Sequence, residues 1–117
     1  KYHYPEIKLM YWAGGNPFHH HQDLNRLLKG WERLDTIISH EWCWNSLAKY
    51  SDIVLPCTTP LEREDIGMTP RDPYVISMAK AKEPFENSLN DFEIFVDALL
   101  LRTAQAFMLG LTMSMSP

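Results

Sequence analysis

Three turns of the sequence carry polar side chains that could bind a phosphate or a nucleotide. The first, Gly14-Gly15-Asn16-Pro17, follows a short apolar run and precedes an amphipathic segment. Small residues between a strand and a helix let backbone N–H groups and the helix dipole approach a phosphate closely. The turn does not match the GxGxxG fingerprint, because Pro17 has no N–H to offer. A plain tight turn has the same residues, so this turn alone does not define a site.

Glu41 and Arg63 follow the next two apolar runs. An acid at the position of Glu41 receives ribose hydroxyl or base N–H groups in mononucleotide-binding βαβ units. It lies 26 residues after Gly15, whereas roughly 20 is usual in dinucleotide folds, which weakens an NAD assignment. The Arg63 guanidinium can hold a phosphate with two N–H groups. A solvated acid and a surface ion pair are the alternative interpretations of these residues.

Two other groups of residues invite catalytic interpretations. His19 to His21 are transition-metal ligand types, but consecutive residues on a helix project about 100° apart and cannot share one ion. Ser39, His40 and the two cysteines could be combined with acids into a nucleophilic centre, yet nothing in their spacing fixes such a geometry. The sequence therefore assigns no catalytic residue and no metal ligand.

The elements that must position these side chains alternate between apolar runs and helix-length segments. Strands are predicted over 7–13, 36–39 and 52–56, and helices over 20–31 and 45–50. The order β-α-β-α-β with right-handed crossovers predicts an α/β fold, a Rossmann-like parallel sheet with flanking helices. Ligands then bind at the carboxyl ends of the strands. Three predicted turns lie at that edge, namely 14–17, 40–44 and 56–65.

The second half of the chain is less regular. Proline and glycine punctuate it, and its only extended run is Tyr74 to Met78, which predicts a short strand between loops. Asn90-Asp91 then precedes a run with helical periodicity, which predicts a final helix from about Asp91. No repeat or linker divides the 117 residues, so a single domain is expected.

Composition excludes several classes of protein. The chain is 45% hydrophobic and 22% charged, which is typical of a globular domain and not of a disordered one. Its net charge of −4 provides no basic field for nucleic acid or an anionic membrane. The run Ile94 to Leu101 falls short of the ~20 apolar residues of a membrane span. The start without Met favours an internal fragment.

Several stretches of the sequence, taken in order, form one pattern: Tyr11-Trp12-Ala13-Gly14-Gly15-Asn16-Pro17-Phe18-His19-His20-His21-Gln22-Asp23-Leu24-Asn25-Arg26, His40-Glu41, Ser51-Asp52-Ile53-Val54-Leu55-Pro56, Thr58-Thr59, Leu61-Glu62-Arg63 and Asn90-Asp91-Phe92. This pattern resembles the dimethyl sulfoxide reductase family of molybdopterin oxidoreductases. Within the family it most resembles the branch of the trimethylamine N-oxide and biotin sulfoxide reductases. The resemblance runs from about Tyr4 to about Val96, and residues 97–117 form an atypical tail.

The resemblance implies a cofactor-binding fragment of a larger multidomain enzyme. Such a stretch grips one of two molybdopterin guanine dinucleotides that hold molybdenum. Carboxylates suit the N–H donors of guanine, and a guanidinium suits phosphate. The residues that the resemblance places against the guanosine diphosphate arm are Asn16, Gln22, His40, Glu41, Arg63 and Asp91.

The resemblance also implies the activity and partners of the parent enzyme. The family reduces N-oxides or S-oxides by oxygen-atom transfer, and its serine ligand to molybdenum lies outside this stretch, so we expect the fragment alone to be inactive. The expected partners are the rest of the reductase chain and a cytochrome-type electron donor, in the periplasm or alternatively the cytoplasm. No nucleic acid is expected as a partner. A free-standing, non-catalytic nucleotide-binding α/β module is the alternative function.

Overall fold

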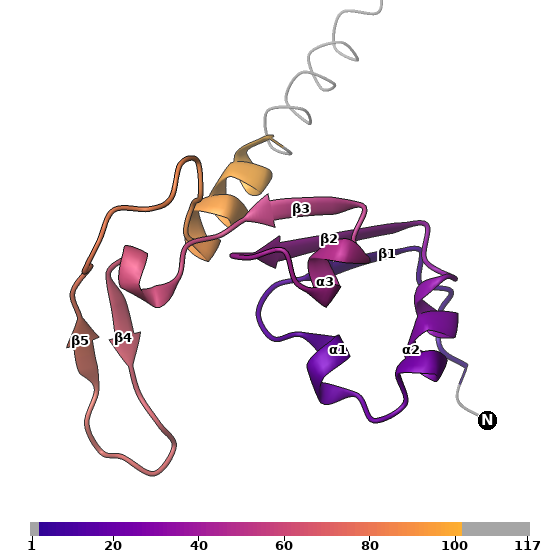
Figure 1. Ribbon diagram of the computed structural model, residues 1–117, viewed down its shortest axis with the longest axis horizontal. Coiled ribbons are helices and arrows are strands. Elements are labelled where there is room, and N and C mark those ends of the chain that lie inside the picture. The colour runs from indigo at the N-terminus through magenta and orange to yellow at the C-terminus, as the bar shows by residue number, and fades with distance from the viewer. Residues whose placement is uncertain (1–2, 102–117) are drawn as a thin grey trace, which may run out of the picture.

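The computed structural model describes residues 3–101, whose centre is a three-stranded parallel sheet (Figure 1). The strands are β1 (Leu9–Trp12), β2 (Thr36–Glu41) and β3 (Ile53–Pro56), in the spatial order β1-β2-β3. Trp12 pairs with Ser39, and Glu41 pairs with Pro56. The β-branched run at the start of β2 favours an extended backbone. The predicted parallel sheet is confirmed, with strand ends within a few residues of the predicted ones.

Three short helices connect the strands, and each begins at a polar cap. They are α1 (Pro17–His20), α2 (Leu24–Trp31) and α3 (Ser46–Lys49). The caps are the side chains of Asn16, Asp23 and Asn45, whose Oδ1 atoms accept backbone N–H groups at 3.0, 3.0 and 3.1 Å. Such caps satisfy N–H groups that have no partner within the helix.

The helix predicted over 20–31 is present but begins later, at Leu24, and a separate short helix, α1, ends at His20. His21 has an extended backbone with φ −80° and ψ 137°, which ends α1. Asp23 then caps a separate helix by accepting the N–H of Arg26. The apolar spacing of the second half was correctly assigned, but a local side-chain hydrogen bond restarts the helix at Leu24.

One face of the sheet packs against these helices to form the core. Phe18, Trp31, Ile37 and Leu47 are buried there, with Met10 and Trp12 packed against them. The Phe18 ring lies 5.3 Å from that of Trp31, with the edge-to-face geometry that aromatic pairs prefer. This core fixes α1 beneath the sheet, and with it the turn that follows β1.

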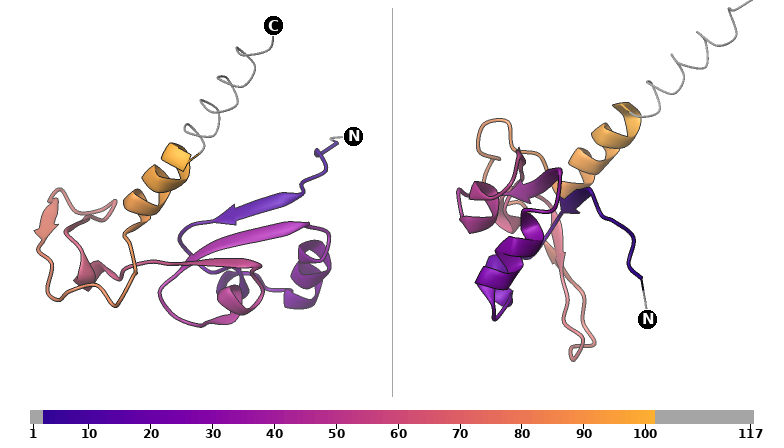
Figure 2. Two further views of the ribbon diagram at one scale, coloured as in Figure 1. Left: turned by 90° about the horizontal axis from the view of Figure 1, so that it is seen from above. Right: turned by 90° about the vertical axis from the view of Figure 1, so that its right-hand side faces the viewer.

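The opposite face of the sheet carries the final helix, over residues 91–101 (Figure 1, Figure 2). Successive side chains of a strand point to opposite faces, so Tyr11 faces this helix while its neighbours face the core. The Tyr11 ring stacks on Phe95 at 5.5 Å. The predicted helix start at Asp91 is confirmed, and helices flank both faces as predicted. Residues 102–117 of the predicted tail lie outside the described residues.

A small hairpin stands apart from the parallel sheet (Figure 1). It follows a single 3-10 turn, η1 (Pro60–Glu62), and pairs β4 (Asp65–Gly67) antiparallel with β5 (Ile76–Met78). The predicted strand over 74–78 is present in shortened form. Strand β4 was not predicted, because its three residues carry no apolar run, and only the pairing with β5 makes it a strand.

Candidate cofactor-binding edge

The three strands of the parallel sheet end at one edge, which we call the carboxyl edge. It comprises residues 13–16 after β1, Glu41 at the end of β2 with residues 42–44 after it, and residues 57–63 after β3, together with Asp91 at the start of the final helix. The backbone N–H of Cys57 donates to the carbonyl of Glu41 at 3.1 Å, which ties two of these segments together. The three predicted turns therefore meet at one edge of the sheet.

The first segment of this edge is a glycine turn with an unusual backbone. Gly14 and Gly15 have φ values of +77° and +68°, which glycine adopts at little cost. A Cβ added at either position would meet nothing within 4 Å. The indole N–H of Trp12 donates to the carbonyl of Gly15 at 3.1 Å. Glycine is thus required here by the backbone conformation and not by crowding, and the space beside the turn is open.

Asn16 closes this turn with a buried side chain, which is only 8% exposed. Its Oδ1 caps α1 by accepting the N–H of Phe18. Its Nδ2 is buried and has no hydrogen-bond partner among the described residues. Leaving such a donor unpaired costs about 1–3 kcal/mol. An acceptor oxygen on a ligand at the carboxyl edge would remove this cost.

Glu41 ends β2 and is 7% exposed. Its Oε2 accepts from Nδ2 of Asn45 at 2.6 Å, so the residue that caps α3 also orients this carboxylate. Burial raises the pKa of Glu41, while the Asn45 hydrogen bond and the charge of His19 oppose the rise. A neighbouring N–H donor from a ligand would stabilise the charged form further.

His40 lies beside Glu41 but points to the opposite face of the sheet. Its Nδ1 is 2.7 Å from Oδ1 of Asp91, and its Nε2 is 2.6 Å from the hydroxyl of Tyr11. Both ring nitrogens are therefore engaged within the protein. The structure joins His40 to Asp91, two of the predicted site residues that stand far apart in the sequence.

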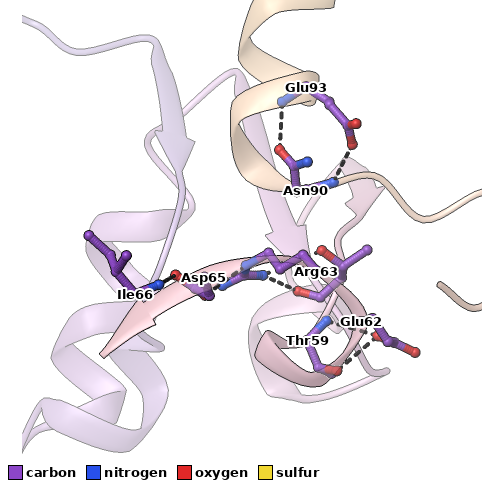
Figure 3. Close-up of polar contacts among 8 residues, drawn as sticks. Thr59, Glu62, Arg63, Asp65, Ile66, Asn90 and Glu93 are labelled. Atoms are coloured by element: carbon purple, nitrogen blue, oxygen red, sulfur yellow. Dashed lines mark hydrogen bonds and ion pairs between the residues drawn. The ribbon is translucent and has the colours of Figure 1, made fainter. Parts of the chain in front are cut away.

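Arg63 follows η1 and is held by its neighbours (Figure 3). Its Nε donates to Oδ2 of Asp65 at 2.9 Å, and its Nη1 donates to the carbonyl of Thr58. No hydrogen bond within residues 3–101 uses its Nη2. The predicted ion pair with a nearby acid is present, and it leaves one guanidinium nitrogen for an anion.

The turn before Arg63 is fixed by a buried acid. The Glu62 carboxylate accepts from both the N–H and the hydroxyl of Thr59 at 2.9 Å (Figure 3), and it lies 3.0 Å from Nζ of Lys82. The Thr59 N–H, followed by the Lys82 ammonium and the Thr59 hydroxyl, lowers the pKa of Glu62 to about 2. Glu62 thereby holds the segment that presents Arg63.

Gln22 is the predicted site residue that the structure does not join to the others. It is exposed in the loop between α1 and α2, and no hydrogen bond or ion pair of the described residues links it to the carboxyl edge. It lines a cavity of about 970 Å³ between the N-terminal segment, β1 and α2.

Two residues that the sequence did not single out for this site also lie here. Cys57 is half-buried, and burial, with the charges of Asp91 and Glu41, raises the pKa of its thiol to about 11, against an opposing effect of Arg63. The second residue is Tyr11. Its position in an aromatic run did not indicate a contact with His40, because only the folded sheet decides which face each side chain occupies.

Histidine metal ligation finds no support in this geometry. His19 to His21 are all exposed, and residues 3–101 contain no group of three or more His, Cys, Asp or Glu side chains placed to hold one ion. Within the same residues, no helix has the length and apolar character needed to cross a bilayer.

Comparison with known proteins identifies the family. The model of the molybdopterin oxidoreductase family matches residues 2–99. The chain belongs to this family. Its relatives include the biotin sulfoxide reductase of Cereibacter sphaeroides, 48% identical over 92 residues, which cover 79% of this chain and 12% of that protein. The trimethylamine-N-oxide reductase of Haemophilus influenzae is 45% identical over 97 residues, 80% of this chain and 12% of that protein.

A third relative is the dimethyl sulfoxide/trimethylamine N-oxide reductase of Rhodobacter capsulatus, 45% identical over 94 residues. That match covers 79% of this chain and 11% of the relative. The chain therefore spans about an eighth of the length of these reductases, all of which are named for N-oxide or S-oxide substrates.

Membership of the molybdopterin oxidoreductase family implies a molybdopterin cofactor with molybdenum. The residues of the carboxyl edge fit the polar part of such a group. The buried Nδ2 of Asn16 lacks an acceptor, and the glycine turn leaves space beside its backbone. Nη2 of Arg63 is not used by the described residues. These donors suit an anionic group, while the carboxylates of Glu41 and Asp91 suit N–H donors.

Proposed function

We propose that this chain is the cofactor-binding part of a larger, multidomain molybdenum oxidoreductase that reduces N-oxides or S-oxides. In this proposal its Rossmann-like sheet grips one guanine dinucleotide arm of a bis-molybdopterin guanine dinucleotide. The observation that carries the proposal is the carboxyl edge of the sheet. A buried amide nitrogen without a partner, a guanidinium and the carboxylate of Glu41 lie there in or after the ends of the parallel strands, together with the carboxylate of Asp91 at the start of the final helix. The names of the relatives support the substrate class.

Each residue has a distinct role in this proposal. Glu41 and Asp91 accept N–H groups of guanine, because carboxylates only accept hydrogen bonds. Arg63 and Nδ2 of Asn16 donate to the phosphate and ribose oxygens. His40 acts through Asp91. Gln22, in its exposed loop, contacts the outer part of the dinucleotide.

The chemistry of the parent enzyme belongs to its cofactor. When bound, the molybdenum centre supplies oxygen-atom transfer, in which the oxide, two electrons and two protons give the amine or sulfide and water. This chain supplies binding and orientation, and the rest of the reductase supplies the remaining part of the site. We further propose a periplasmic location and a cytochrome-type electron donor for the parent enzyme.

The test is titration of the 117-residue chain with GDP and with ADP, followed by tryptophan fluorescence. We expect tighter binding of GDP, because the carboxylates receive guanine N–H groups that adenine does not present in that pattern. Removing one charged acceptor in Glu41→Gln or Asp91→Asn should weaken GDP binding about tenfold and leave ADP binding nearly unchanged.

Matched controls are available on the surface. Glu83→Gln and Asp35→Asn change the same functional groups at side chains that are 83% and 67% exposed and lie outside the carboxyl edge, so they should not alter GDP binding. A folded chain that does not prefer GDP to ADP, or a loss of equal size in the control variants, contradicts the proposal.

A further inference from the structure

A chain of hydrogen bonds runs across three elements on the face of the sheet opposite the core. The Tyr11 hydroxyl on β1 lies 2.6 Å from Nε2 of His40 on β2. Nδ1 of His40 lies 2.7 Å from Oδ1 of Asp91, the first residue of the final helix. The three residues are separated by 29 and 51 positions in the sequence, so only the folded sheet brings them together.

For a neutral His40 imidazole, the chemistry of the three groups fixes the direction of these hydrogen bonds. The Asp91 carboxylate can only accept, so Nδ1 of His40 must carry the proton that it donates. Nε2 of the neutral ring then has a lone pair, which accepts the hydroxyl proton of Tyr11. In the other tautomer a lone pair on Nδ1 would face a carboxylate oxygen. The Tyr11 hydroxyl therefore favours the tautomer that donates to Asp91.

Packing buries the His40 end of this series of hydrogen bonds and leaves the Asp91 end exposed to solvent. The His40 side chain is 1% exposed, and its ring lies 5.2 Å from that of Tyr11 and 5.1 Å from that of Phe95. The Asp91 side chain is 44% exposed. No hydrogen bond within residues 3–101 uses Oδ2 of Asp91. One carboxylate oxygen is thus anchored from inside, and the second is available at the carboxyl edge.

We propose that Tyr11 and His40 are positioning residues that hold the Asp91 carboxylate in the orientation that accepts the N–H groups of a guanine base. This inference rests on the proposed function, because it concerns the same nucleotide site. Neither Tyr11 nor His40 needs to touch the ligand through its polar atoms. Guanine presents two adjacent donors, N1–H and the exocyclic amino group, so its recognition depends on the rotation of the carboxylate as well as on its charge.

The test uses the full 117-residue chain and the variant Tyr11→Phe, which removes the hydroxyl and keeps the ring that stacks on Phe95. The probes are GDP and IDP, since IDP lacks the exocyclic amino group. Long-range proton–nitrogen NMR spectra report which nitrogen of His40 carries the proton. Tyr74→Phe is the matched control, because this tyrosine is 73% exposed on the hairpin segment.

We expect His40 of the unmodified chain to be protonated at Nδ1 and GDP to bind more tightly than IDP. Tyr11→Phe should raise the population of the Nε2-protonated tautomer and reduce the preference for GDP over IDP about fivefold, the loss expected for one net hydrogen bond. Tyr74→Phe should change neither quantity. In a His40→Asn background, which retains an N–H donor near the position of Nδ1 but has no tautomer to select, adding Tyr11→Phe should have no further effect.

The outcomes separate this inference from the function on which it rests. If Tyr11→Phe raises the population of the Nε2-protonated tautomer while the preference for GDP over IDP is unchanged, the positioning role is wrong and the proposed function stands. A proton on Nε2 of the unmodified chain overturns the positioning role as well. A folded chain without preference for GDP over ADP overturns the proposed function, and the positioning role falls with it.

Discussion

Gly14 and Gly15 are the residues whose conformation most directly shapes the carboxyl edge. Both have positive φ angles, and neither has a neighbour that a side chain would strike. The requirement for glycine is therefore a property of the backbone alone. Because crowding plays no part, the effect of a substitution at either glycine measures the cost of the backbone conformation.

Gly15→Ala should lower the free energy of unfolding by about 1 kcal/mol, because an L-residue is disfavoured at φ +68°. Gly30→Ala is the matched control. Gly30 lies in α2, has no positive φ and also has no atom within 4 Å of an added Cβ, so alanine there should stabilise the chain by about 0.5 kcal/mol. Urea unfolding of both variants measures the two effects, and destabilisation of equal size would contradict the backbone explanation.

Asn16 and Asn45 show how one side chain can serve both the fold and the site. Asn16 caps α1 with its oxygen while its amide nitrogen stays unpaired. Asn45 caps α3 and donates to Glu41. Substitutions of these asparagines would therefore disturb a helix and the site together, which is why the acids and not the caps are the residues to change in binding experiments.

At the scale of elements, the short turn η1 depends on one buried carboxylate. Glu62 receives two hydrogen bonds from Thr59 and lies beside Lys82, which lowers its pKa to about 2. An acid whose folded-state pKa is depressed stabilises the fold above its unfolded-state pKa. That stability is lost as the pH falls from about 4.5 through about 2.

Glu62→Gln should therefore flatten the acid limb of the unfolding free energy between these pH values and lower stability at neutral pH. Equilibrium unfolding at a series of pH values measures this limb. Glu83→Gln, at an exposed acid that pairs with Lys80, should leave the limb as it is. An unchanged acid limb in Glu62→Gln would show that the Thr59 contacts do not persist in solution.

The first turn of the final helix is the part of this element that contributes to the site. The Asn90 and Glu93 side chains each accept the other's backbone N–H at 2.9 Å (Figure 3), which fixes the first turn of the helix. Asp91 stands between them and reaches His40. The buried imidazole of His40 thus joins the first residue of the helix to β2, beside the backbone hydrogen bonds that Leu89 makes with Pro56 and Thr58 at the end of β3.

At the scale of the whole molecule, a ligand that bridges several segments of the carboxyl edge must stabilise the fold. The strands contribute separate binding groups, and the unfolded chain offers them no common geometry. GDP at about 100 times its dissociation constant should raise the free energy of unfolding by about 2.7 kcal/mol, with a matching rise in melting temperature. Differential scanning calorimetry measures this rise, and an equal rise with ADP would argue against guanine recognition.

The sequence alone determined the features that depend on local chemistry. The alternation of apolar runs and helix-length segments predicted the parallel sheet. Strands that are covered on both faces of a sheet are apolar throughout, and the helices that cover them are apolar on one side only. Asn45 and Asn90 were correctly expected at helix starts, because capping acts within three residues. The order of motifs also identified the family to which the chain belongs.

Only the tertiary structure decided the features that depend on distant contacts. Strand β4 exists because β5, eleven residues further along the chain, pairs with it. The face that Tyr11 occupies is set by the register of β1, and its hydrogen bond to His40 spans 29 residues. Composition and residue spacing report only on contacts between residues that are close in the sequence. The hydrogen bonds from Tyr11 through His40 to Asp91 join three elements that are distant in the sequence, so they become visible only in the folded structure.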